Sequence, residues 1–131
     1  MGNAVITGMG IVSCIGNSVD EVTENLKKGQ SGIIFNEKYR DMGFRSHVSG
    51  SIDLDVTELI DRKTLRFMSK AAAYAYIASN QALMQANIEI SNLDRSRIGV
   101  VAGSGGASPA AQIVASDIAR EKGPKRIGPY S

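Results

Sequence analysis

The sequence has little of the chemistry on which many enzyme sites depend, because it contains one cysteine, one histidine and no tryptophan. A single cysteine, Cys14, excludes an intramolecular disulfide and a cysteine-rich zinc site, and we interpret it as a small buried hydrophobic residue. No Ser-His-Asp or Cys-His pairing can be assembled around His47. Carboxylate clusters and metal-ligand spacings are also missing, so we expect no metal and no cofactor.

Strong net charge and long hydrophobic runs are missing too. The net charge is only +2, which argues against a general nucleic-acid binder. No apolar run approaches the ~20 residues of a membrane span, and no basic segment followed by an apolar one marks a signal peptide. We therefore expect a cytoplasmic protein that binds neither nucleic acid nor membrane.

What is present suits an ordinary globular domain, with 43% hydrophobic and 21% charged residues in a chain of 131. Continuous apolar runs predict buried strands over 4–12 and 97–103, and a shorter strand lies within 46–52. A capping box at Ser18 and Glu21 predicts a helix over 19–28. Helices are also predicted from Ser69 through the alanine-rich stretch and over 109–120. This order favours an α/β fold with parallel strands.

The predicted elements need more neighbours than the chain supplies. Two strands of buried type require flanking strands and covering layers, and the alanine-rich helix is apolar on nearly every side, so it should be buried. We therefore expect the chain to be a fragment that does not fold well alone.

Two glycine-rich segments invite ligand-binding interpretations. Gly8 and Gly10 follow a predicted strand, but Ser13 replaces the third glycine of a dinucleotide-binding fingerprint and the next helix begins too late. The second segment, 103–106, lacks the Gly-Lys-Ser/Thr ending of a phosphate-binding loop. Its glycines either allow a positive φ or leave space for a ligand, and the sequence does not decide between the two.

Basic residues gather at 62–70 and at 120–126, with few acids among them. Lys63 and Arg66 are three residues apart and share one face of any helix that contains them. Both groups are either solvated surface or a means of attracting an acidic partner.

Four segments, in this order, resemble landmarks of the β-ketoacyl-acyl-carrier-protein synthases, type I, within the condensing-enzyme superfamily. They are residues 4–13 (AVITGMGIVS), 59–63 (LIDRK) with 66–69 (RFMS), 101–106 (VAGSGG) and 128–131 (GPYS). The resemblance covers the whole chain. It implies that residues 1–131 are part of an N-terminal thiolase-like domain, with an incomplete mixed sheet and covering helices.

The activity that this resemblance implies is a decarboxylating condensation in fatty-acid elongation. Acyl and malonyl groups carried by acyl carrier protein are the substrates, and the complete protein is a homodimer. The family's Cys-His-His set cannot be placed on Cys14 or His47 and is expected beyond Ser131. The resemblance therefore assigns no catalytic residue to this chain, which alone should be inactive.

The resemblance does transfer two binding roles. It assigns Arg62, Lys63 and Arg66 to the surface that meets acidic carrier protein, and Lys122 and Lys125 to a second basic pair contributed by the other subunit of the dimer. It places Gly106 and Ala107 at the acyl pocket. Gly106 fits the type I pattern, whereas Ala107 departs from the usual glycine and leaves the chain-length preference open.

Two alternatives remain within this resemblance. One is a type II or polyketide synthase, and the other is a partner subunit of the chain-length-factor kind, which lacks the catalytic cysteine. The sequence beyond Ser131 separates the enzymes from the partner subunit, because only the enzymes carry that cysteine.

Overall fold

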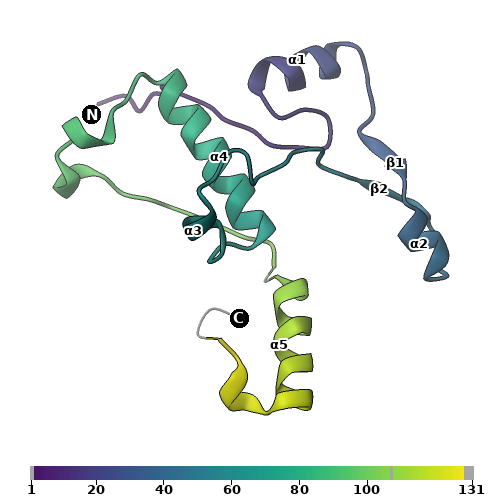
Figure 1. The fold of residues 1–131 in the computed structure, drawn as a ribbon. Helices are drawn as coiled ribbons and strands as arrows, with labels where there is room; N and C mark the ends of the chain where they lie inside the picture. Colours follow the sequence, from purple (N-terminus) through teal and green to yellow (C-terminus); the bar gives the residue numbers. More distant parts are fainter. Residues whose placement is uncertain (1, 107, 129–131) are drawn as a thin grey trace.

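The computed structural model describes residues 2–106 and 108–128, which form helices joined by long extended segments (Figure 1). In chain order the elements are α1 (Val19–Lys27), β1 (Ile33–Phe35), α2 (Glu37–Asp41), β2 (Val48–Gly50), α3 (Arg62–Leu65), α4 (Lys70–Gln85), the 3₁₀ turns η1 (Ile90–Asn92) and η2 (Arg95–Arg97), α5 (Pro109–Lys122) and the 3₁₀ turn η3 (Pro124–Arg126).

Helix α1 forms where its capping signals predict it. The Ser18 side chain accepts the Glu21 N–H at 3.2 Å, and the Glu21 carboxylate accepts the Asn17 N–H at 2.7 Å. At the other end, Gly29 has a φ of 64°, the left-handed conformation that commonly ends a helix. The prediction of a helix over 19–28 is confirmed.

Helices α4 and α5 also follow signals that are local in the sequence. Ser69 caps α4, and Ser108 caps α5 with Pro109 at its first turn. Gly123 ends α5 with a φ of 83°. Both predicted helices are confirmed, and α5 runs to Lys122, beyond the predicted bounds of 109–120.

Strands β1 and β2 form an antiparallel pair, with Ile34 opposite Ser49. The strand expected within 46–52 is confirmed as β2, whereas β1 and α2 were not predicted. The Asn36 side chain caps α2 by accepting the Tyr39 N–H at 3.2 Å, which turns the chain directly out of β1.

The strands predicted over 4–12 and 97–103 do not form in the described part of the chain. Both segments are largely extended, but neither lies beside a strand that could share its backbone hydrogen bonds. Val5 is 78% exposed and Val101 is fully exposed. The expectation of parallel strands is therefore wrong for residues 2–106 and 108–128, because apolar runs indicate burial without specifying a partner strand.

The N-terminal segment is held instead by side chains of α4. The Gln81 side-chain oxygen accepts the Ile11 N–H at 2.9 Å, and its amide nitrogen donates to the Asn17 carbonyl at 2.6 Å. The Gln85 side chain accepts the Met9 N–H at 2.6 Å. These amides take the place that a neighbouring strand has in a sheet, so residues 9–11 lie along α4.

Gly8 and Gly10 allow this close approach. A Cβ at Gly8 would collide with the Ala82 carbonyl, and one at Gly10 would collide with the Ala78 carbonyl. Both glycines therefore face the backbone of α4, and the next helix, α1, begins only at Val19. Close packing against α4 accounts for this glycine pair.

We predict that Gly10→Ala destabilises the full-length protein by about 1–3 kcal/mol, because the added methyl must displace the α4 backbone. Gly2→Ala is the matched control, since a Cβ at Gly2 meets nothing within 4 Å. Urea unfolding of both variants measures the difference. Equal midpoints for the two variants would contradict the close approach.

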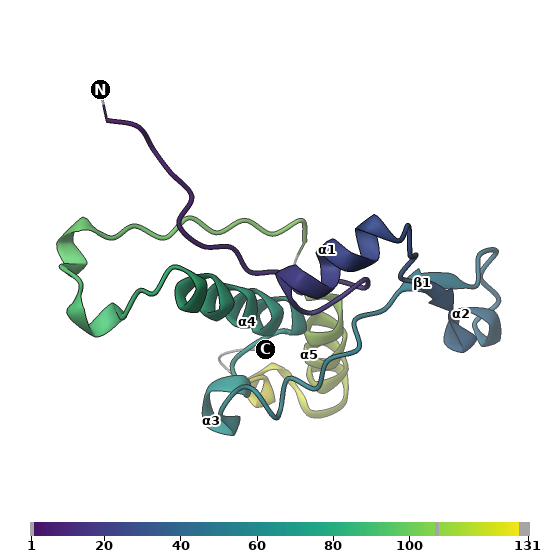
Figure 2. The same ribbon diagram turned by 90° about the horizontal axis from the view of Figure 1, so that it is seen from above.

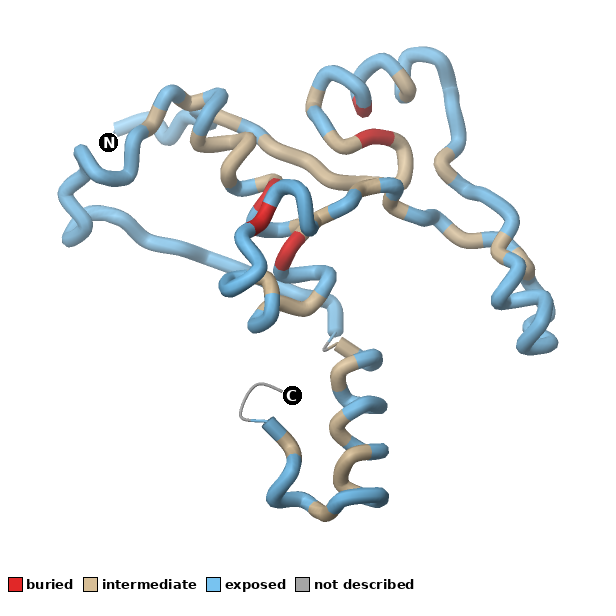
Figure 3. Tube along the Cα trace, viewed as in Figure 1, coloured by how far each residue is buried: buried red, intermediate tan, exposed pale blue. Residues whose placement is uncertain are grey.

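Burial in the described residues is confined to short stretches (Figure 3). Ile60, Ala73 and Ile77 form one cluster, and Val22 of α1 is buried separately. Helix α4 was expected to be buried, yet only Ala73 and Ile77 of its residues are. That expectation is wrong for this chain, whereas the expectation that the chain does not fold well alone stays a prediction.

Candidate functional site

The first basic group begins on α3, a short helix capped by an acidic residue. The Asp61 carboxylate accepts the Lys63 N–H at 2.9 Å and the Thr64 N–H at 3.3 Å. This cap turns the chain into α3 directly after the buried Ile60. The basic side chains that follow are consequently carried on a defined helical turn.

The α3 basic surface consists of Arg62, Lys63 and Arg66, all exposed. None of them forms an ion pair within residues 2–106 and 108–128, whereas Lys27 and Arg40 pair with neighbouring carboxylates. Like charges three or four residues apart on a helix oppose one another. Among the described residues, these three cations therefore repel one another without an ion pair to offset the repulsion.

A nearby acid does not neutralise this surface. The Thr57 hydroxyl donates to the Asp55 carboxylate at 2.6 Å, and the Thr57 N–H does so at 2.8 Å. The hydrogen bond from the hydroxyl, and to a smaller extent the one from the N–H, holds the pKa of Asp55 below its ordinary value. The carboxylate is therefore ionised at neutral pH, with its described hydrogen bonds directed at Thr57 instead of α3.

Phe67 was not among the predicted site residues. The guanidinium carbon of Arg66 lies 4.3 Å from the centroid of the Phe67 ring, within the range of a cation–π contact. An aromatic residue directly after a basic one was the available signal in the sequence.

The second basic group lies at the end of α5 and in η3. Lys122 and Lys125 are exposed and form no ion pair within the described ranges, whereas Arg120 lies 3.6 Å from Asp117. Figure 1 shows this end of the chain well away from α3. The structure therefore does not bring the two basic groups together within one chain.

The glycine-rich segment 103–106 lines a hollow of about 620 Å³. Neither Gly103 nor Gly106 has a positive φ, and a Cβ at either position would meet nothing within 4 Å. The positive-φ alternative is therefore wrong for these two glycines, and the missing side chains leave space. Ala107, the other residue expected at an acyl pocket, lies outside the described residues.

This hollow is enclosed by the first turns of two helices. Ser69, Lys70, Ala71, Ala72 and Ala75 come from the start of α4. Ser108, Pro109 and Ala110 come from the start of α5, with Ala102, Gly103, Ser104 and Gly106 between the helices. The walls are small residues throughout, apart from Lys70 and Pro109, so a slender apolar chain fits the hollow better than a bulky polar ligand.

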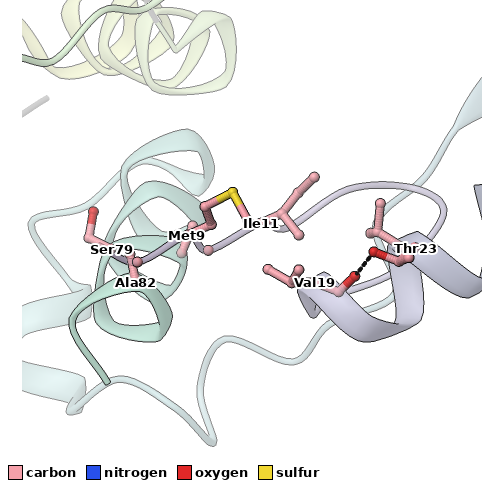
Figure 4. Close-up of a pocket in the computed structure, with 10 residues that line it drawn as sticks. Met9, Ile11, Val19, Thr23, Ser79 and Ala82 are labelled. Carbon is pink, nitrogen blue, oxygen red and sulfur yellow. Dashed lines mark hydrogen bonds between the residues drawn. The ribbon is translucent and has the colours of Figure 1, made fainter. Parts of the chain in front are cut away.

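A separate hollow of about 530 Å³ lies between the N-terminal segment, α1 and α4 (Figure 4). Its lining includes no charged side chain. The Thr23 hydroxyl donates to the Val19 carbonyl at 2.7 Å, and the Ser79 hydroxyl to the Ala75 carbonyl at 2.8 Å, so both are directed back at their own helices. This hollow offers apolar packing area and little polar recognition.

From the sequence, neither Cys14 nor His47 was assigned a catalytic role. Cys14 is half-buried, less enclosed than expected, and the His47 ring packs edge-on against Phe35 with centroids 6.0 Å apart. Across the described residues, no three His, Cys, Asp or Glu side chains lie together as a metal site would require. Within the same residues, no helix has the length and apolar character to cross a membrane.

Taken together, these features are an exposed group of three basic side chains on and next to α3 and a hollow lined mostly by small residues. The chain matches the family described as "Beta-ketoacyl synthase, N-terminal domain" over residues 2–130. It therefore belongs to the β-ketoacyl synthase family, as its sequence motifs predict.

Its relatives include several named synthases. The chain is 48% identical over 132 residues to 3-oxoacyl-[acyl-carrier-protein] synthase 1 of Escherichia coli strain K12, covering 99% of this chain and 32% of that protein. It is 46% identical to the synthase 1 of Haemophilus influenzae, covering 100% and 32%. With 3-oxoacyl-[acyl-carrier-protein] synthase 2 of Vibrio harveyi the identity is 34%, covering 96% and 31%. The chain thus spans about a third of the length of these relatives.

Proposed function

We propose that the protein containing this chain is a 3-oxoacyl-[acyl-carrier-protein] synthase of type I. The observation that carries the proposal is the 48% identity to a synthase 1 along almost the entire chain. The reaction transfers an acyl group from acyl carrier protein to a cysteine of the synthase. Decarboxylation of malonyl-carrier protein then generates the carbanion that attacks this acyl group. The Cys-His-His set of this chemistry is proposed to lie outside residues 1–131.

In this proposal the chain supplies binding surfaces for substrate and carrier. Arg62, Lys63 and Arg66 dock acidic carrier protein through charge-assisted hydrogen bonds. Lys122 and Lys125 serve the same purpose from the other subunit of a homodimer, which agrees with their distance from α3 within one chain. Gly106 forms part of the wall that faces the acyl chain.

The unpaired segments fit this proposal as well. Residues 4–12 and 97–103 would join a larger sheet of thiolase-like type in the complete protein, and helix α4 would be covered there. The exposed side chains of Val5 and Val101 support this view, since each would gain burial worth about 1.5–3 kcal/mol.

The test is the condensation itself, measured with full-length protein, acyl-carrier protein and malonyl-carrier protein. The proposal predicts a 3-oxoacyl product and one CO₂ released per product. Carrier binding without product would favour the non-catalytic partner subunit instead. Absence of both binding and product would overturn the assignment to carrier-dependent chemistry.

A further inference from the structure

Arg66 is held differently from the other arginines that have a described partner. Arg40 lies 2.8 Å from Asp41, and Arg120 lies 3.6 Å from Asp117. Arg66 instead has the ring of Phe67 4.3 Å from its guanidinium carbon and no ion pair within the described residues. An aromatic ring, and not a carboxylate, therefore sets the position of this cation.

This difference matters for what the guanidinium can still bind. A carboxylate partner occupies the N–H donors of arginine, whereas a ring contacts the flat face of the group and leaves the donors at its edge available. Arg66 is also the C-cap residue of α3, so no further helical turn restricts its long side chain. Without the ring, the side chain would sample many rotamers that a partner must then immobilise.

Arg66 also lines a hollow of about 410 Å³. Arg62 lines the same hollow, and its remaining lining comes from Thr57, Ile60 and Leu65. A carboxylate that enters this hollow would therefore meet two arginines and no acidic residue of the lining, which favours charge-assisted hydrogen bonds.

We propose that Phe67 is a positioning residue for docking: its ring holds Arg66 ready for a paired, bidentate contact with a carboxylate of acyl carrier protein. The inference rests on the proposed function, because it names how one cation of the α3 basic surface is prepared for its partner. Phe67 contributes by reducing the number of conformations that Arg66 loses on binding. It does not need to touch the carrier.

A double-mutant cycle between Phe67 and Arg66 tests this directly. Carrier-protein affinity is measured for full-length wild type, Phe67→Leu, Arg66→Ala and the double variant. We expect Phe67→Leu to weaken binding about three- to tenfold. In the Arg66→Ala background the same change should have no further effect, because no guanidinium remains to be positioned.

The segment from β1 to β2 offers a matched control. Arg40 lies 5.9 Å from the Phe35 ring centroid, on a part of the chain that Figures 1 and 2 both show apart from α3. Phe35→Leu removes an Arg–Phe contact that is longer than that of Arg66 and belongs to an arginine paired with Asp41, and it should leave carrier affinity unchanged. Equal weakening by Phe35→Leu would mean that loss of an aromatic side chain, wherever it lies, lowers affinity, and would overturn the positioning role.

The remaining outcomes separate this inference from the proposed function. If Arg66→Ala alone leaves carrier affinity unchanged, the docking surface itself is wrong. If Arg66→Ala weakens binding but Phe67→Leu has the same effect in both backgrounds, the α3 basic surface still docks the carrier, and the positioning role of Phe67 is wrong. Should Phe67→Leu lower the thermal midpoint, Phe67→Trp decides the matter: its larger ring face should preserve affinity, and a loss there overturns the inference.

Discussion

Reversing the charges of Lys63 and Arg66 to glutamate should weaken carrier-protein binding by roughly a hundredfold or more at low salt. The reason is that two attractive contacts become repulsive, and within the described residues neither Lys63 nor Arg66 forms an ion pair. Wild-type affinity should fall steeply as ionic strength rises, since the Debye length is only ~3 Å at 1 M salt. Titration of full-length protein with carrier protein at low and high salt measures both effects.

Lys27→Glu/Lys28→Glu is the control for this experiment. Lys27 is the last residue of α1 and Lys28 is its C-cap; both are more than half exposed, and the double reversal changes the net charge by the same amount. This variant should bind carrier protein nearly as well as wild type, because its charges lie away from α3. If both double variants lose affinity equally, the protein attracts the carrier through its overall charge and α3 is not a specific docking surface.

The helices were predictable because their signals are local. Ser18, Ser69 and Ser108 each cap the helix that begins directly after them, and Gly29 ends α1. A cap needs only residues within one turn of chain, all of which are visible in the sequence. Helix α3 was not predicted, although its N-cap, Asp61, is a local signal of the same kind.

The prediction of strands over 4–12 and 97–103 was wrong for a physical reason. An apolar run such as 4–12 indicates burial, but pairing depends on a second segment far away in sequence. In the described residues the N–H groups of Met9 and Ile11 go to Gln85 and Gln81. No local sequence pattern predicts these two hydrogen bonds, since glutamine on a helix is ordinarily a solvated residue.

In the candidate site too, some features were predictable from the sequence and others depend on contacts between distant segments. From the sequence, Lys63 and Arg66 share one face of any helix that contains them, and in the structure both are exposed, Lys63 on α3 and Arg66 as its C-cap residue. The sequence could not indicate that Gly106 lies in a hollow walled by the first turns of α4 and α5, because that hollow depends on how the two helices meet. The sequence shows Phe67 directly after Arg66, but it could not indicate that the two side chains meet, since neighbouring residues often point apart.

Gly106→Ile should restrict the length of acyl chain that the enzyme accepts. A Cβ at Gly106 meets nothing within 4 Å, so the new side chain is accommodated without displacing the backbone. It then occupies part of the hollow of about 620 Å³, volume that a long acyl chain would otherwise use. We expect kcat/KM for long acyl primers to fall roughly 10- to 200-fold, whereas short primers lose much less.

Gly105→Ile separates this effect from a general disturbance of the glycine-rich segment. A Cβ at Gly105 also meets nothing within 4 Å, but Gly105 is not part of the lining of the hollow. It should therefore leave the preference for acyl length unchanged. The measurement is elongation of carrier-bound primers of increasing length by the full-length protein. If Gly106→Ile slows short and long primers alike, or if Gly105→Ile gives the same length dependence, Gly106 does not form the wall of the acyl pocket.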